Sequence, residues 1–222
     1  MGNVEAELCR EKDIGAGCGC AYPEYVADDI VIRSNIIHRE LKTTLEQLPS
    51  WKGLLAQRPR AAVFSVNRNR VAVTHGDEQS LGGWHCSVEA LSRPDRQNKL
   101  FSWMEKMRLD VKATTHTCTP AALARQNRAV INNGAAGMPN FSGKLYGLAT
   151  RITDAPSENA LYRTLWRNLY VEAIPIPCQH KAFLEWFEKI WPNGSPAEQS
   201  YKERITRGPV FSAKEALLGG FL

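Results

Sequence analysis

Short β-branched segments alternate with amphipathic segments along this 222-residue chain, and that alternation limits the folds open to it. Residues 61–66 and 71–74 flank the Asn-containing turn 67–69, a pattern that predicts a β-hairpin. Further predicted strands cover residues 111–113, 129–132, 145–152 and 169–174. Because helical segments separate these strands, the chain is expected to form a layered α+β (α/β-like) sheet protein.

Helical periodicity is clearest in three places. Residues 28–48 carry an apolar stripe and are followed by Pro49, which predicts the end of a helix there. A second helix is predicted after Pro94. The C-terminal part is also predicted helical, and one apolar face there is expected to belong to the core; it consists of Phe183, Trp186, Phe187 and Ile190. Residues 1–222 show no repeat or linker and are predicted to form a single domain.

The composition excludes several classes of protein. A chain with 43% hydrophobic and 23% charged residues is neither disordered over most of its length nor collagen-like. No apolar run approaches the roughly 20 residues that span a bilayer, so no membrane partner is expected. The acidic start, Met1-Gly2-Asn3-Val4-Glu5, differs from a signal peptide. A cytoplasmic location with reduced cysteines is therefore expected.

The net charge of +5 comes from 28 basic and 23 acidic residues that are scattered along the chain. Scattered charge is typical of a solvated surface, and it permits a nucleic-acid partner without indicating one. A positive balance also suits an anionic small substrate. The sequence specifies no oligomeric state.

Two histidines share one sequence context. His75 directly follows the predicted strand 71–74, and His116 follows the strand near 111–113 by a few residues. Ligands bind at the carboxyl ends of strands in open sheets, and two imidazoles delivered to one edge can converge on a divalent metal ion. The alternative is that each histidine only caps its strand or makes a surface hydrogen bond.

Two glycine-containing segments are candidate binding sites, one for an anion and one for zinc. The turn 132–137 follows an apolar strand and can place backbone N–H groups near an anion, although such turns are common. Cys18-Gly19-Cys20 is too closely spaced for an ordinary zinc knuckle, and no second pair follows at metal-site spacing. Neither segment by itself predicts a function.

Four motifs together resemble the later motifs of the calcineurin-like metallophosphoesterase family, and they stand in that family's order. They are Gly2-Asn3-Val4-Glu5, strand-His75-Gly76-Asp77, strand-Thr115-His116-Thr117-Cys118, and the segment 132–140, Asn-Asn-Gly-Ala-Ala-Gly-Met-Pro-Asn. The resemblance covers essentially the whole chain. It implies a four-layer αββα sandwich, metal-dependent hydrolysis of phosphate esters, and two divalent ions of manganese, iron or zinc.

Carried over by position, the resemblance makes Asn3, His75 and His116 metal ligands. Cys118 stands where the family has a second histidine, so it is either a thiolate ligand or a packed small residue. Asn133 and Gly134 fall in the turn that would contact substrate phosphate.

The departures from the family pattern lower the expected activity. Val4 stands where the family has a histidine that assists the leaving group. The family's Asp-x-His and Gly-Asp-x-x-Asp motifs precede Gly-Asn, which here lies at positions 2 and 3. The chain is therefore expected to be an N-terminally incomplete phosphoesterase that binds metal weakly and is impaired or inactive in hydrolysis.

Three other functions were considered. A degenerate phosphoesterase-fold binding or scaffold module is the main alternative to an enzyme. A cysteine phosphatase would use Cys118, but six residues separate it from Arg125, one more than the familiar phosphate loop has. A serine hydrolase built on Ser80 lacks the first glycine of the nucleophile elbow.

Overall fold

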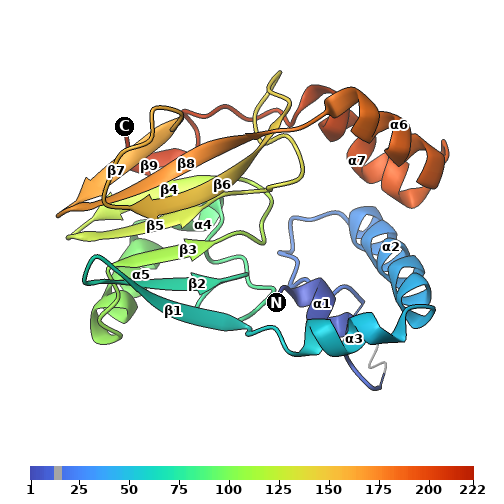
Figure 1. The fold of residues 1–222 in the computed structure, drawn as a ribbon, viewed down its shortest axis with the longest axis horizontal. Helices are drawn as coiled ribbons and strands as arrows, with labels where there is room; N and C mark the ends of the chain where they lie inside the picture. The colour runs from blue at the N-terminus through green and yellow to red at the C-terminus, as the bar shows by residue number, and fades with distance from the viewer. Residues whose placement is uncertain (13–16) are drawn as a thin grey trace.

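A mixed β-sheet forms the centre of the molecule (Figure 1). In the computed structural model, which describes residues 1–12 and 17–222, the sheet has six strands in the order β1-β2-β3-β5-β4-β9. These strands are β1 (Ala61–Val66), β2 (Asn69–Thr74), β3 (Val111–Thr114), β4 (Ala121–Arg125), β5 (Arg128–Asn132) and β9 (Leu217–Gly219). β2, β3 and β5 run parallel to one another, so their carboxyl ends share one edge of the sheet.

The predicted hairpin is confirmed as β1 and β2, which pair antiparallel from Ala61–Thr74 to Val66–Asn69. Only Asn67 and Arg68 form the turn, with φ angles of 47° and 65°. Positive φ at both central residues marks the type I′ turn, whose twist matches that of the strands, and asparagine tolerates this conformation.

A second, antiparallel sheet packs face to face on the first. Its order is β6-β8-β7, with β6 (Tyr146–Thr153), β7 (Tyr162–Trp166) and β8 (Leu169–Pro177). The core between the sheets includes Val111 and Ile131 from the first sheet and Leu148 and Val171 from the second, all fully buried. The alternation of inward apolar residues along each strand produces this sandwich.

Helices cover the outer face of the six-stranded sheet. α4 (Val88–Leu91) and α5 (Pro94–Lys106) bury Leu100 and Met104 against Ala72 and Val130. The helix predicted after Pro94 is confirmed, and it begins at that proline because the missing N–H is not needed in the first turn. The predicted α+β sandwich is confirmed.

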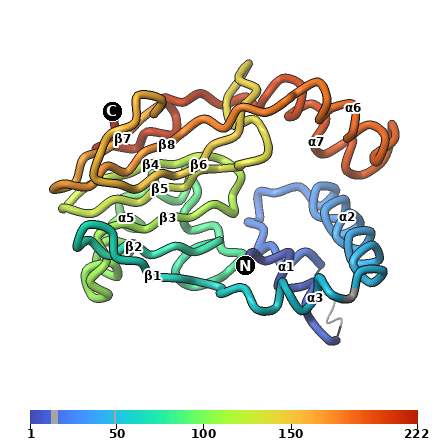
Figure 2. Tube along the Cα trace, in the orientation of Figure 1, coloured from blue at the N-terminus to red at the C-terminus, as the bar shows by residue number. Residues whose placement is uncertain are grey.

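The remaining helices lie beyond the edge of the molecule at which the parallel strands β2, β3 and β5 end (Figure 2). They are α1 (Asn3–Leu8), α2 (Asp28–Glu46), α3 (Pro49–Ala56), α6 (His180–Ile190) and α7 (Pro196–Arg207). α2 packs against α7, and Pro49 starts α3 instead of only ending the preceding helix. In the described ranges, no helix combines the length and apolar character needed to cross a membrane.

The predicted core face near the C-terminus is only partly correct. Phe187 of α6 is buried with Ala197 and Ile205 of α7, but Trp186 and Ile190 are 55% and 48% exposed. Only one side of α6 packs against its neighbours, so the apolar side chains of Trp186 and Ile190, which lie outside that contact, remain exposed to water.

β1 forms an exposed edge of the six-stranded sheet. Its residues 61–66 carry no charge, and Val63 and Phe64 are 55% and 56% exposed. An uncharged apolar edge strand presents unpaired backbone groups to other chains. This edge is the part of the sandwich most open to self-association.

Replacing Val63 by lysine is expected to raise the concentration at which the purified protein stays monodisperse, because a charge on an edge strand disfavours strand addition. Light scattering against protein concentration measures this. Val210→Lys adds the same charge at a fully exposed position outside the sheets and serves as the control. Equal scattering by Val63→Lys and the wild type would contradict the expectation.

Candidate functional site

His75 and His116 meet at the carboxyl edge of the six-stranded sheet. His75 follows β2, His116 follows β3, and the two strands are parallel neighbours. His75 Nε2 lies 3.1 Å from His116 Nδ1, and the ring centroids are 5.0 Å apart at an interplanar angle of 63°. The structure thus brings together the two imidazoles that the sequence placed at strand ends.

Backbone contacts hold this strand edge in place. Thr114 Oγ1 donates to the carbonyl oxygens of both His75 and Gly76, and Thr115 N donates to His75 O at 3.1 Å. Thr74 Oγ1 donates to Gly76 O at 3.0 Å. The threonines that end β2 and β3 therefore fix the turn that carries His75.

Both imidazoles are poised in the neutral form. Burial, assisted by the neighbouring His75, lowers the pKa of His116 to about 4. Burial also lowers the pKa of His75, assisted by the N-terminal ammonium group and opposed by Glu5. Neutral imidazole nitrogen is the form that binds metal ions.

Asn3 is the first residue of α1 and directly follows Gly2, which lies against the His75 ring. Gly2 abuts the His75 ring, because a Cβ atom placed on Gly2 would be 3.1 Å from His75 Nδ1. The Asn3 side chain is buried, and its Nδ2 donates to Cys18 O at 2.7 Å and to Cys20 Sγ at 3.1 Å. The amide nitrogen of Asn3 therefore joins α1 to the segment around Cys18.

The surroundings of Cys118 disfavour the thiolate form of its side chain. Its Sγ donates to His116 O at 3.5 Å, its carbonyl accepts from Arg204 Nη2 at 2.6 Å, and burial raises the pKa of the thiol. Arg125, the arginine that a cysteine phosphatase would need, bonds instead to side chains of α5. The contacts therefore favour a packed cysteine over a nucleophile.

Polar groups of Asn133 and Gly134 form hydrogen bonds to other groups of the protein. Asn133 Nδ2 donates to Leu148 O at 2.7 Å, and Gly134 N donates to Asn132 Oδ1 at 2.9 Å. Thr115 Oγ1 donates to Gly134 O at 2.7 Å, which ties the turn to the residue before His116. Phosphate binding by Asn133 and Gly134 stays a prediction.

The loop after His75 contributes residues that sequence reasoning missed. The buried Asp77 carboxylate accepts from the backbone N–H groups of Gln79 and Ser80 at 2.8 Å and of His85 at 3.1 Å, and His85 Nδ1 lies 2.9 Å from it. Burial alone would raise the pKa of Asp77, but these hydrogen bonds outweigh it and lower the pKa. A Cβ atom at position 83 would collide with this carboxylate, which explains why a glycine stands there.

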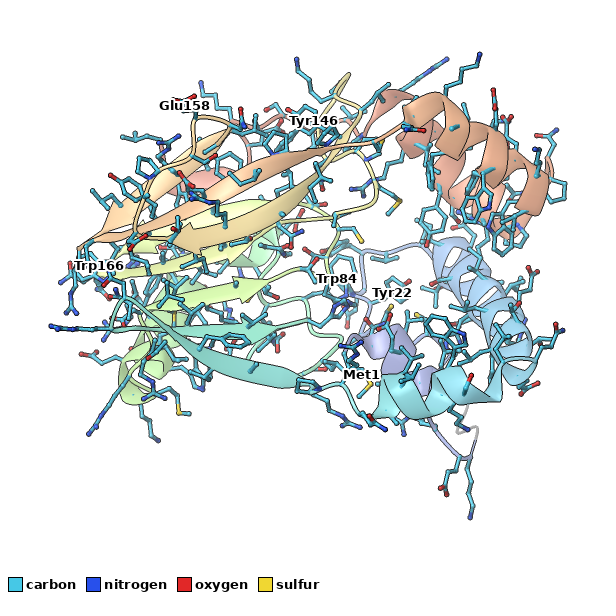
Figure 3. All side chains as sticks on the ribbon, viewed as in Figure 1. Met1, Tyr22, Trp84, Tyr146, Glu158 and Trp166 are labelled. Carbon is cyan, nitrogen blue, oxygen red and sulfur yellow. The ribbon has the colours of Figure 1, made fainter. Side chains whose placement is uncertain are left out.

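Trp84 packs against His116, and it lies close to Tyr22 (Figure 3). Its ring meets the His116 ring edge-on at 5.7 Å and the Tyr22 ring at 6.0 Å. Among the described residues, Trp84 Nε1 and His116 Nε2 are buried without a hydrogen-bond partner. The Gly82-Gly83-Trp84-His85 sequence is the signal that could have drawn attention to this loop.

Cys18 and Cys20 form a further polar cluster next to Asn3. The hydrogen bond from Cys20 is the main cause that lowers the pKa of Cys18 to about 5, while the pKa of Cys20 is raised. Cys18 Sγ also contacts the hydroxyl groups of Tyr22 and Ser34. Within residues 1–12 and 17–222, no three His, Cys, Asp or Glu side chains gather as a metal site.

The imidazole pair fits one metal ion better than two. Zinc–nitrogen bonds measure about 2.0–2.1 Å, so two nitrogens on one tetrahedral or octahedral ion lie about 2.8–3.4 Å apart. The observed 3.1 Å between His75 Nε2 and His116 Nδ1, which is also the length of a hydrogen bond between the two rings, lies within this range. The described residues add no carboxylate to this pair, and a bridging carboxylate is what a second ion would need.

Comparison with known proteins places the fold. No family model matches the sequence, and no curated protein matches it. A hypothetical protein of Pyrococcus horikoshii, PH1004, superposes with a TM-score of 0.60 at 11% identity, over 95% of this chain and 72% of the other. A metallophosphoesterase of Sphaerobacter thermophilus superposes with a TM-score of 0.50 at 11% identity, over 94% of this chain and 75% of the other. The chain has a metallophosphoesterase-like fold. At this identity the likeness shows the metallophosphoesterase-like fold alone, so the chemistry must be argued from the residues.

Proposed function

We propose that this chain binds one divalent metal ion through His75 and His116 and is a metal-dependent phosphoesterase of low activity. The observation that supports this most is the 3.1 Å approach of His75 Nε2 to His116 Nδ1 at the carboxyl edge of the sheet. Two neutral imidazoles at that spacing suit one ion of manganese, iron or zinc. The metallophosphoesterase-like fold adds the expectation of a phosphate-ester substrate.

The residues around the pair would shape this chemistry. A bound divalent ion supplies a hydroxide nucleophile near neutral pH and offsets charge on phosphate oxygens. His75 and His116 would hold the ion, Trp84 shields one side of the pair from water, and Asn3, which follows Gly2 at the His75 ring, is the expected amide oxygen ligand. Exclusion of water strengthens each of these electrostatic interactions.

Low activity follows from the donors that the described residues lack. No carboxylate joins the imidazoles to fix a second ion, and neutral ligands alone hold a dication less tightly. Val4, in α1, stands where the family resemblance would place a histidine that assists the leaving group. Hydrolysis is therefore expected to be slow even when the site is loaded.

Metal binding provides the test. His75→Ala and His116→Ala are each expected to weaken manganese or zinc binding by at least about tenfold, because each removes one nitrogen ligand. Equilibrium dialysis with metal analysis measures this, and hydrolysis of an aryl phosphate with manganese should fall in parallel. His180→Ala, at the start of α6, is the matched histidine control. Unchanged affinity in the His75/His116 double variant would refute the site.

A non-catalytic binding module is the second candidate. The absence of a three-residue His, Cys, Asp or Glu cluster within the described ranges favours it. In that case the purified protein should hold no metal above the level of the double variant and should hydrolyse no phosphate ester. A scaffold partner would then be expected instead of a substrate, and the same dialysis experiment separates the two proposals.

A further inference from the structure

Trp84 contacts His116 and also belongs to the wall of a separate pocket of about 490 Å³. The pocket lies between the segment 21–25, the loop that follows His75, and the start of α4 with the turn after it. Its volume falls within the range of small-molecule sites. A ligand there would thus share one aromatic wall with the imidazole pair.

The lining includes two aromatic side chains. Trp84 and Tyr25 both line the pocket, and Tyr25 is 65% exposed, so its ring is free to cover a ligand. Trp84 is held by its ring contacts with His116 and Tyr22. One fixed and one exposed aromatic ring form a stacking platform for a planar ligand.

His85 is the polar group with a defined orientation. Its Nδ1 lies 2.9 Å from the Asp77 carboxylate, which also accepts hydrogen bonds from the backbone N–H groups of Gln79, Ser80 and His85. This contact holds the imidazole ring of His85 beside Asp77. The side chain is about half exposed at 49% and lines the pocket, so the ring is accessible for a hydrogen bond with a ligand.

Charges of both signs complete the lining. Arg93 and Glu89 both face the pocket, and in the described part of the chain neither forms an ion pair. Together with His85 and Ser87 they offer both donors and acceptors. A bare hydrocarbon ring would leave these groups unsatisfied, whereas a heteroaromatic ring with exocyclic donors and acceptors would pair with them.

We propose that this pocket binds the base of a nucleotide, stacked on Trp84 and hydrogen-bonded to His85, with the nucleotide phosphate directed toward His75 and His116. The placement of the phosphate rests on the proposed function, whereas base binding does not. The substrate class would then be nucleoside phosphate esters.

Calorimetry with matched probes tests base binding in the full chain. The four common nucleoside 5′-monophosphates are compared with ribose 5-phosphate, which has the same phosphate and no base, with EDTA and with manganese. At least one nucleotide is expected to bind about tenfold more tightly than ribose 5-phosphate in both conditions. Ala90→Phe, which fills the pocket from α4, should abolish that advantage, and Tyr25→Ala should reduce it about threefold. Trp186→Ala, on exposed α6, is the control and should leave it unchanged.

The outcomes separate the two proposals. A nucleotide advantage that persists in EDTA and is lost in Ala90→Phe supports the pocket even if the wild type binds no metal, and the metal proposal would then fail alone. If manganese binds but every nucleotide equals ribose 5-phosphate, the pocket proposal is overturned. No measurable nucleotide binding at millimolar concentration, or an advantage that survives in Ala90→Phe, overturns it as well.

Discussion

Arg96→Ala is expected to lower the free energy of unfolding by about 3–5 kcal/mol, which is the size of effect seen when one partner of a buried ion pair is removed. Arg96 of α5 donates to both carboxylate oxygens of Glu78, at 2.5 and 2.8 Å, and both side chains are only 5% exposed. Its Nε also donates to His85 O at 2.8 Å. The variant would leave the Glu78 carboxylate buried without its partner.

A double-variant cycle in urea gives the control for this prediction. Glu78→Ala combined with Arg96→Ala should cost less than the sum of the two single variants, because neither charge is then left alone in the interior. The Arg96→Ala protein should also show altered Trp84 fluorescence, since Arg96 anchors the loop between Glu78 and His85 to α5. A loss below about 1 kcal/mol for Arg96→Ala would mean that water already reaches this pair.

Acidification of the metal-free protein is expected to reduce stability by about 2–3 kcal/mol between pH 6.5 and pH 4, because of His116. Its pKa falls from 6.5 in the unfolded chain to about 4 in the folded protein. Between these values the unfolded chain binds a proton that the folded protein does not, so stability rises with pH across this window. The lowered pKa of His75 acts in the same direction.

His116→Gln isolates this contribution, because glutamine does not titrate. Urea unfolding in EDTA at several pH values between 4 and 7 should give a shallower dependence for the variant than for the wild type. Carboxylates such as Asp77, whose pKa is lowered, add their own loss of stability mainly at lower pH in both proteins. An equal pH dependence of the free energy of unfolding in the two proteins would show that folding does not lower the pKa of His116.

Local patterns in the sequence were enough for the main elements of the fold. The β-branched run 71–74, the helical spacing after Pro94 and the hairpin turn each depend on neighbours within a few residues, and all are confirmed. The strand β4 was missed because its segment, Ala121–Arg125, is rich in alanine, which has little strand preference. α1 was missed because six residues give too little periodicity to recognise.

The candidate site could likewise be predicted only in part from the sequence. Both histidines could be placed at strand ends from the sequence, because a strand and the residue that follows it are adjacent in the chain. Their 3.1 Å approach depends on the parallel pairing of β2 with β3, and the Asp77–His85 and Glu78–Arg96 pairs join residues 8 and 18 positions apart.

The amino-acid sequence by itself determined the alternation of strands and helices and the chemical character of the two strand-end histidines. Only the tertiary structure decided which polar groups are buried together, and with that the neutral state of His116, the buried Glu78–Arg96 ion pair and the pocket beside Trp84. The physical reason is that burial and electrostatic coupling depend on distances in space, which local sequence patterns do not contain.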